Sequence, residues 1–164
     1  MGQPLNGRIY LQKLQTVAYL CIGIPLLFFI YAYLESSVDQ LEEIIPSNYH
    51  LYILFPLILI CLIINYWSIK KYKFLINQSF SKLALREKLA LYQEGNNNRF
   101  IMYGISAMMI SIGFYLTNFQ PFAALFGIIV VLFSINNPNA RKIVTELKLR
   151  NKDKEIIYNG LEIP

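Results

Sequence analysis

Few residues in this chain could do chemistry, and their spacing matches no catalytic or metal-binding pattern. His50 is the single histidine, so a Ser–His–Asp arrangement would need a second chain to complete it. One histidine is too little for a zinc site, and the two cysteines, Cys21 and Cys61, form no CxxC pair. The sequence therefore predicts a protein that is not an enzyme and has no catalytic residue, metal site or cofactor.

Four carboxylates lie close together and raise the alternative of a cation site: Glu35, Asp39, Glu42 and Glu43. A calcium loop places its oxygen ligands around a central glycine, and residues 35–43 contain no glycine. A solvated acidic face is the favoured interpretation, with residues 37–45 as a short amphipathic helix at the membrane surface.

The positions of the charges define the class of protein. The composition is 55% hydrophobic, and no charged residue occurs in residues 14–34, 44–69 or 100–140. A bilayer core of about 30 Å needs roughly 20 residues of helix. The first two windows each hold one span, and the third holds two, joined at the polar residues 117–121. We expect four transmembrane helices, with a proline kink at Pro25 in the first.

The fifteen lysine and arginine residues set the orientation, because all of them fall on one side of this four-span arrangement. Basic loops stay in the cytoplasm. Both termini are therefore expected to be cytoplasmic, in a bacterial inner membrane. The net charge of +5 is interpreted as attraction to an anionic inner leaflet rather than to nucleic acid.

A short pattern occurs twice, each time after a membrane-length apolar segment. Residues 81–88 and 145–152 both read [ST]-x-L-x-L-R-x-K. This predicts an all-α membrane protein of four transmembrane helices in two tandem helical hairpins, each followed by a basic cytoplasmic helix. The two halves would be residues 1–99 and 100–164. The alternative is a chance match in a chain rich in leucine and lysine.

Each copy of the pattern presents two leucines about 200° apart on a helix, one for the bundle and one for a partner. The candidate residues for partner or lipid binding are Lys82, Leu85, Arg86, Lys88, Leu149, Arg150 and Lys152. On the helix that contains the first copy, one face carries Leu85, Leu89 and Tyr92, and another carries Phe80, Ala84 and Leu91. One stripe can face lipid or the body of the protein, and the C-terminal stripe of Ala140, Ile143 and Leu147 is the candidate partner for the other.

Helix boundaries follow from turn-forming residues. Gly95 and residues 96–98 are expected to end the first basic helix and give a flexible connection. Asn137 is expected to cap a helix that begins at Pro138. A last short helix, residues 152–158, should end at Gly160 with Leu161 packing back, a Schellman-type stop.

Small residues repeat on one face of each of the last two spans, and such faces let transmembrane helices approach closely. The candidate packing residues are Gly104, Ala107 and Ser111 in the third span and Ala123, Gly127 and Ser134 in the fourth. We expect these faces to form the two sides of one tight hairpin. Asn65, in the second span, is expected to seek a hydrogen-bond partner on a neighbouring helix.

Two function classes remain. The first is a non-catalytic polytopic membrane subunit that self-associates as a homo-oligomer, or docks a membrane-complex partner, through basic cytoplasmic helices. The second is a small-solute or ion facilitator, for which the Pro25 kink and Asn65 would line a path. No span contains an ionisable side chain, and a path needs polar groups at several depths. The first class is therefore favoured, and a membrane-interface enzyme is the least favoured.

Overall fold

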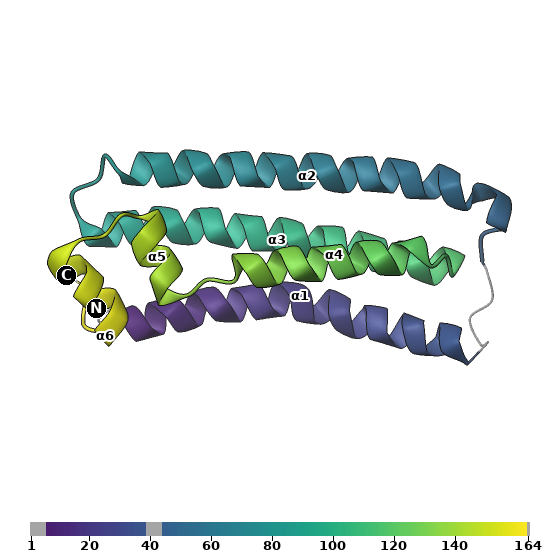
Figure 1. The fold of residues 1–164 in the computed structure, drawn as a ribbon, viewed down its shortest axis with the longest axis horizontal. Helices are drawn as coiled ribbons and strands as arrows, with labels where there is room; N and C mark the ends of the chain where they lie inside the picture. The colour runs from purple at the N-terminus through teal and green to yellow at the C-terminus, as the bar shows by residue number, and fades with distance from the viewer. Residues whose placement is uncertain (1–5, 39–43, 164) are drawn as a thin grey trace, which may run out of the picture. The chain divides into compact units, whose positions relative to one another are not determined.

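The computed structural model describes residues 6–38 and 44–163, which are almost entirely helical (Figure 1). The elements in chain order are α1 (Gly7–Ser37), η1 (Ser47–Tyr49), α2 (His50–Ser79), α3 (Leu85–Thr117), α4 (Pro121–Asn136), α5 (Ala140–Glu146) and α6 (Asn151–Asn159). An isolated antiparallel bridge pairs Asn6 with Glu162. The short amphipathic helix predicted over residues 37–45 falls largely outside the described residues.

Among the residues that the structure describes, three helical segments are long and apolar enough to cross a membrane: Gly7–Ser37, Ser47–Ser79 and Leu85–Thr117. A fourth is reached only if α4 and α5, which are bent by 75° relative to each other, are counted as one span. The predicted all-helical membrane class is thus supported by length and composition, with three spans or up to four.

Two predicted helix boundaries are confirmed. α3 ends at Thr117 and α4 begins at Pro121, on either side of the polar turn. α6 ends at Asn159 and is followed by Gly160, whose φ of 65° lies in the left-handed region that glycine enters without strain. The Leu161 N–H donates to the carbonyl of Ile156 at 3.0 Å, as a Schellman stop requires.

The predicted start of α5 is displaced by two residues. Asn139, not Asn137, is the N-cap, and its side-chain oxygen accepts the backbone N–H of Lys142 at 2.8 Å. Its extended backbone (φ −139°, ψ 164°) is the conformation an N-cap needs. Pro138 therefore precedes the helix instead of opening it.

The expected break at Gly95 and residues 96–98 is wrong, because α3 runs through them without interruption. Gly95 is buried, and a Cβ placed on it would lie 3.1 Å from Cδ2 of Tyr72 on α2. The glycine lets two helices approach rather than ending one. The basic stretch between spans two and three is consequently the end of α2 and the start of α3, not a separate cytoplasmic helix.

The two copies of the eight-residue pattern have unlike conformations, so the expectation of equivalent helices is wrong. Residues 81–84 form a turn and α3 begins at Leu85, whereas residues 145–146 end α5 and Leu149 lies between α5 and α6. The third positions also differ, since Leu83 is 98% exposed and Leu147 is buried. The shared letters therefore do not mark a structural repeat.

The chain divides into two compact units, and each draws on both halves of the sequence. We call residues 1–19, 68–99 and 137–164 the basic unit, and residues 20–67 and 100–136 the apolar unit. These boundaries differ from the predicted division after residue 99. All fifteen basic residues belong to the basic unit.

Each unit has its own interior. The core of the basic unit consists of Tyr10, Leu14, Tyr72, Leu85, Leu89, Tyr92, Ile143, Val144, Leu147, Leu149, Ile157 and Ile163. Of the two apolar stripes expected near the first copy, the Leu85 stripe is the one that packs with Ile143 and Leu147 of the C-terminal stripe. The apolar unit is built around aromatic rings, and Phe29 of α1 stacks on Phe126 of α4 with ring centroids 4.1 Å apart.

Candidate functional site: a buried polar cluster in the basic unit

Leu85 and Leu149, the two leucines predicted to contact a partner, are core residues of the basic unit. Leu85 is 4% exposed and Leu149 is 6% exposed, and both belong to its hydrophobic cluster. Neither has a side left over for a partner, so their proposed docking role is wrong. The exposed leucine of the first stretch is Leu83 instead.

The bases of the same two stretches stay at the surface. Lys82 forms an ion pair with Glu87 at 3.3 Å, and Lys88 is half-buried. Arg86, Arg150 and Lys152 are exposed. The structure therefore brings the leucines of the two stretches together and leaves the bases available to solvent or to a partner.

The small-residue face of α3 is buried, but against α1. A Cβ on Gly104 would lie 2.6 Å from the carbonyl oxygen of Cys21. Pro25 has no N–H, so α1 cannot form its usual hydrogen bond from residue 25 to that carbonyl. Ala107 and Ser111 are fully buried on the same face, and the Ser111 hydroxyl lies 3.5 Å from the Pro25 carbonyl oxygen.

The matching face of α4 does not pack, so the predicted small-residue hairpin is wrong. Gly127 and Ser134 are exposed, Ala123 is half-buried, and no atom lies within 4 Å of a Cβ placed on Gly127. The buried face of α4 is aromatic and aliphatic: Phe122, Phe126, Ile129 and Phe133. Large rings fill more of the space between these helices than small residues could, so they take the interior position.

Asn65 bridges two helices of the apolar unit. Its Nδ2 donates to the Ser106 hydroxyl of α3 at 2.9 Å and to the Cys61 carbonyl at 2.8 Å. This is the arrangement expected of a polar side chain that links transmembrane helices.

The remaining residues with chemical potential have structural contacts. His50 begins α2, and its Nε2 lies 2.9 Å from the Ile45 carbonyl oxygen, with the ring against Phe119. Among the residues that the structure describes, no group of three or more His, Cys, Asp or Glu side chains could hold a metal ion. Of the four clustered carboxylates, only Glu35 lies in the described part.

Sequence reasoning missed a buried polar cluster between α2, α3 and α5 of the basic unit. Tyr72 is at its centre: the Tyr72 hydroxyl donates to Oε2 of Glu146 at 2.5 Å, and the Arg99 guanidinium lies 4.0 Å above the centre of the tyrosine ring. Arg99 is buried, and its Nη2 donates to Oδ1 of the fully buried Asn96 at 2.7 Å. A buried guanidinium is costly unless it is hydrogen-bonded and faces a π surface, and both conditions hold here.

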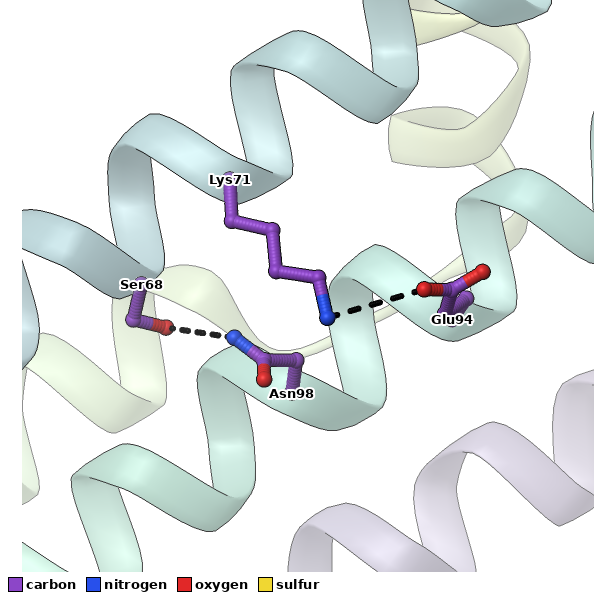
Figure 2. Close-up of polar contacts among 4 residues, drawn as sticks. All are labelled: Ser68, Lys71, Glu94 and Asn98. Atoms are coloured by element: carbon purple, nitrogen blue, oxygen red, sulfur yellow. Dashed lines mark hydrogen bonds and ion pairs between the residues drawn. The ribbon is translucent and has the colours of Figure 1, made fainter.

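Polar pairs on the neighbouring turns align α2 with α3 (Figure 2). The Asn98 amide nitrogen donates to the Ser68 hydroxyl at 3.5 Å, and Lys71 forms an ion pair with Glu94 at 3.6 Å. The ion pair is half-exposed, so its contribution is at most about 1 kcal/mol. These contacts fix the register of the two helices more than they stabilise the fold.

Lys142 is a second base of the cluster, and its surroundings disfavour the charged form of its amine. The pKa of Lys142, on α5, lies below its ordinary value, first because the amine is partly buried and second because Arg99 is nearby. Glu146 opposes this effect by favouring the charged form. The carboxylate of Glu146 thus accepts the Tyr72 hydroxyl and also stabilises the charged form of Lys142.

An open groove of about 300 Å³ lies beside the cluster, still within the basic unit. It is lined by Tyr72, Lys73, Ile76, Asn77 and Glu146. The groove brings an acid, a base and an amide together with an apolar side chain, so its lining offers both hydrogen-bond donors and acceptors to a ligand.

One signal in the sequence could have revealed the cluster. Buried positions of α3 recur at spacings of four and three: Leu85, Leu89, Tyr92, Asn96 and Arg99. This stripe continues through the Gly-Asn-Asn-Asn stretch, so it indicates one continuous helix. The buried face of that helix is apolar at Leu85 and Leu89 and polar at Asn96 and Arg99.

Comparison of the chain with protein-family models, with curated proteins and with solved structures gives no match.

Proposed function

We propose that the chain is a non-catalytic multi-pass membrane subunit whose apolar unit lies in the bilayer and whose basic unit self-associates or docks a partner. The observation that carries this proposal is the segregation of charge. Every lysine and arginine belongs to the basic unit. The charged residues of the apolar unit are all acidic, and they lie within residues 35–43.

Helix lengths in the apolar unit support placement in a bilayer. It contains residues 20–37 of α1, 50–67 of α2 and 100–117 of α3, together with all of α4, so its segments are 16–18 residues long. At 1.5 Å per residue these segments rise about 24–27 Å, close to the thickness of a hydrocarbon core. Two hairpins, α1–α2 and α3–α4, would then cross the membrane.

The side chains of the apolar unit also fit a lipid environment. Leu27, Tyr52, Phe55 and Ile135 are large, apolar and exposed. In water such a surface would drive aggregation, whereas lipid chains would cover it without cost. By the positive-inside rule, the basic unit and both termini would be cytoplasmic, facing an anionic leaflet.

The surface of the basic unit supports docking at the turn between α2 and α3. Leu83 is 98% exposed there, beside Lys82 and near Arg86 in the chain. An exposed leucine flanked by bases favours a partner surface that offers an apolar pocket with acidic residues around it.

Site-specific photo-crosslinking in membranes tests the proposal. A benzophenone side chain at Leu83 should form a protein adduct, either with a second copy or with another subunit, whereas one at Leu27 should label lipid. Arg86→Glu should reduce the Leu83 adduct without changing membrane insertion. A chain that forms no protein adduct at Leu83 would contradict the docking role.

Cysteine labelling tests the orientation separately. In a chain with Cys21 and Cys61 replaced by serine, Leu83→Cys should react from the cytoplasmic side and Ser47→Cys from the other side. Labelling of both positions from one side would contradict the proposed topology.

The facilitator alternative is less well supported, because polar side chains of the apolar unit are engaged in its helices. Ser111 and Thr117 donate to carbonyls four residues back, at 2.8 and 2.7 Å, and Asn65 donates to Ser106. Proteoliposome flux with a panel of ions and small solutes distinguishes the two classes, since a facilitator would raise flux above that of empty vesicles.

A further inference from the structure

We infer that the groove beside Tyr72 binds a headgroup that carries both a phosphate and a primary amine, as in phosphatidylethanolamine. The inference rests on the membrane placement proposed above. Its volume of about 300 Å³ is at the small end of ligand pockets, which suits a headgroup better than a whole lipid.

The acid in the groove is held in a fixed position. The Tyr72 hydroxyl donates to Oε2 of Glu146, which holds this carboxylate at the lining of the groove. The tyrosine ring is itself held by the Arg99 guanidinium on its face and by Gly95 of α3 at its edge. A carboxylate oriented in this way binds an ammonium group with little loss of side-chain entropy.

The base lies on the same groove but is not neutralised by the acid. In the part of the chain that the structure describes, no ion pair joins Lys73 to Glu146. Lys73 and Asn77 are four residues apart on α2 and therefore share one helical face. Their ammonium and amide groups offer several N–H donors, which is the chemistry that recognises a phosphodiester.

The groove also lies at a suitable depth along α2. Tyr72 follows Ile69, the last residue of the uncharged window, by three residues, and Asn77 follows it by eight. The corresponding rise is about 5–12 Å at 1.5 Å per residue. The polar layer of a bilayer is roughly 5–7 Å thick on each side, so Tyr72 and Lys73 lie at headgroup level and Asn77 lies just beyond it.

The charge on Glu146 decides between lipid classes. A headgroup with a phosphate and no amine would bring a second negative charge towards this carboxylate, whereas an aminoethyl phosphate places its ammonium there. The groove should therefore prefer a zwitterionic headgroup, although the basic unit as a whole attracts anionic lipid.

Lipid binding to the full chain, purified in detergent, tests the inference without depending on membrane orientation. Phosphatidylethanolamine and phosphatidylglycerol with identical acyl chains are titrated and followed by native mass spectrometry. We expect phosphatidylethanolamine to bind about tenfold more tightly, the effect of one charge-assisted hydrogen bond. Equal affinity for the two lipids would overturn the inference.

Three variants assign the effect to the groove. Glu146→Gln keeps an acceptor for the Tyr72 hydroxyl and should abolish the preference by weakening phosphatidylethanolamine alone. Lys73→Gln alters an exposed side chain and should weaken both lipids. Lys70→Gln, an exposed base on the same helix outside the groove lining, should change neither. An undiminished preference in Glu146→Gln would overturn the inference.

A competition arm distinguishes a lipid from a soluble source of the same chemistry. Free phosphoethanolamine that displaces the lipid at similar concentration would identify a soluble ligand, and weak displacement would identify the lipid. If Glu146→Gln does not fold, Lys73→Gln decides, because unchanged binding of both lipids to that variant excludes the groove.

Discussion

The two units of this protein differ in how much large apolar surface they expose, since most of the exposed large apolar side chains among the described residues belong to the apolar unit. In the basic unit, Tyr10, Leu14 and Leu89 are fully buried, as in a water-soluble domain. In the apolar unit, Leu27 and Phe55 are exposed. This difference is what the membrane placement proposed above would produce, because lipid would remove the penalty for exposing apolar surface, whereas water enforces it.

The contacts that hold the units differ in the same sense. The basic unit uses hydrogen bonds between distant segments, for example from the Tyr10 hydroxyl to the Leu89 carbonyl at 2.7 Å. The apolar unit has the Asn65–Ser106 hydrogen bond but adds ring stacking, as between Phe29 and Phe126, and backbone approach at Gly104. Different kinds of substitution should therefore lower the folding stability of the two units.

The largest effect is expected from a charge in the core of the basic unit. Leu85→Glu places an unpaired carboxylate among buried apolar side chains and should cost on the order of 4 kcal/mol or more. Limited proteolysis and thermal unfolding in detergent would show the loss. Leu83→Glu, at the exposed neighbouring position, is the matched control and should leave stability unchanged. Equal loss in both variants would mean that exposure does not govern stability here.

The next effect is expected from overpacking in the apolar unit. Gly104→Leu forces a side chain against the Cys21 carbonyl of α1 and should cost about 3 kcal/mol. Gly127→Leu meets open space and should leave the melting temperature in detergent unchanged. If Gly127→Leu is the more damaging of the two, α4 packs through its small-residue face after all.

A smaller effect should follow from removing one hydroxyl of the polar cluster. Tyr72→Phe leaves Glu146 without its donor and should destabilise the basic unit by about 1–3 kcal/mol. Tyr158→Phe, on the exposed face of α6, is the control and should have no effect. Unfolding monitored by hydrogen exchange at α5 would detect the difference. Identical exchange rates at α5 in both variants would show that the hydrogen bond from Tyr72 to Glu146 does not stabilise the basic unit.

The smallest effect is expected for the hydrogen bond between α2 and α3 of the apolar unit. A double-mutant cycle of Asn65→Ala and Ser106→Ala should give a coupling of about 0.6 kcal/mol, the usual size within a membrane. Thermal unfolding of the four chains in detergent measures it. A coupling near zero would show that this contact only fixes the register.

Most of the wrong sequence predictions concern the tertiary neighbours of a residue rather than the helix that contains it. Glycine commonly ends a helix, but Gly95 lies inside α3 and gives room to the Tyr72 ring of α2. Gly104 and Gly127 have the same local signature, and only the arrangement of α1 and α4 makes one indispensable and the other free. Local propensity does not encode the identity of a distant neighbour.

The sequence by itself determined the helical class, the apolar segments, the turn before Pro121 and the stop at Gly160, since these depend on composition and local backbone preference. It also determined the segregation of charge. Only the tertiary structure decided that Leu85 and Leu149 are interior and that Tyr72, Arg99 and Glu146 meet, because these residues are brought together by packing between distant segments. The groove that we propose as a headgroup site exists for the same reason.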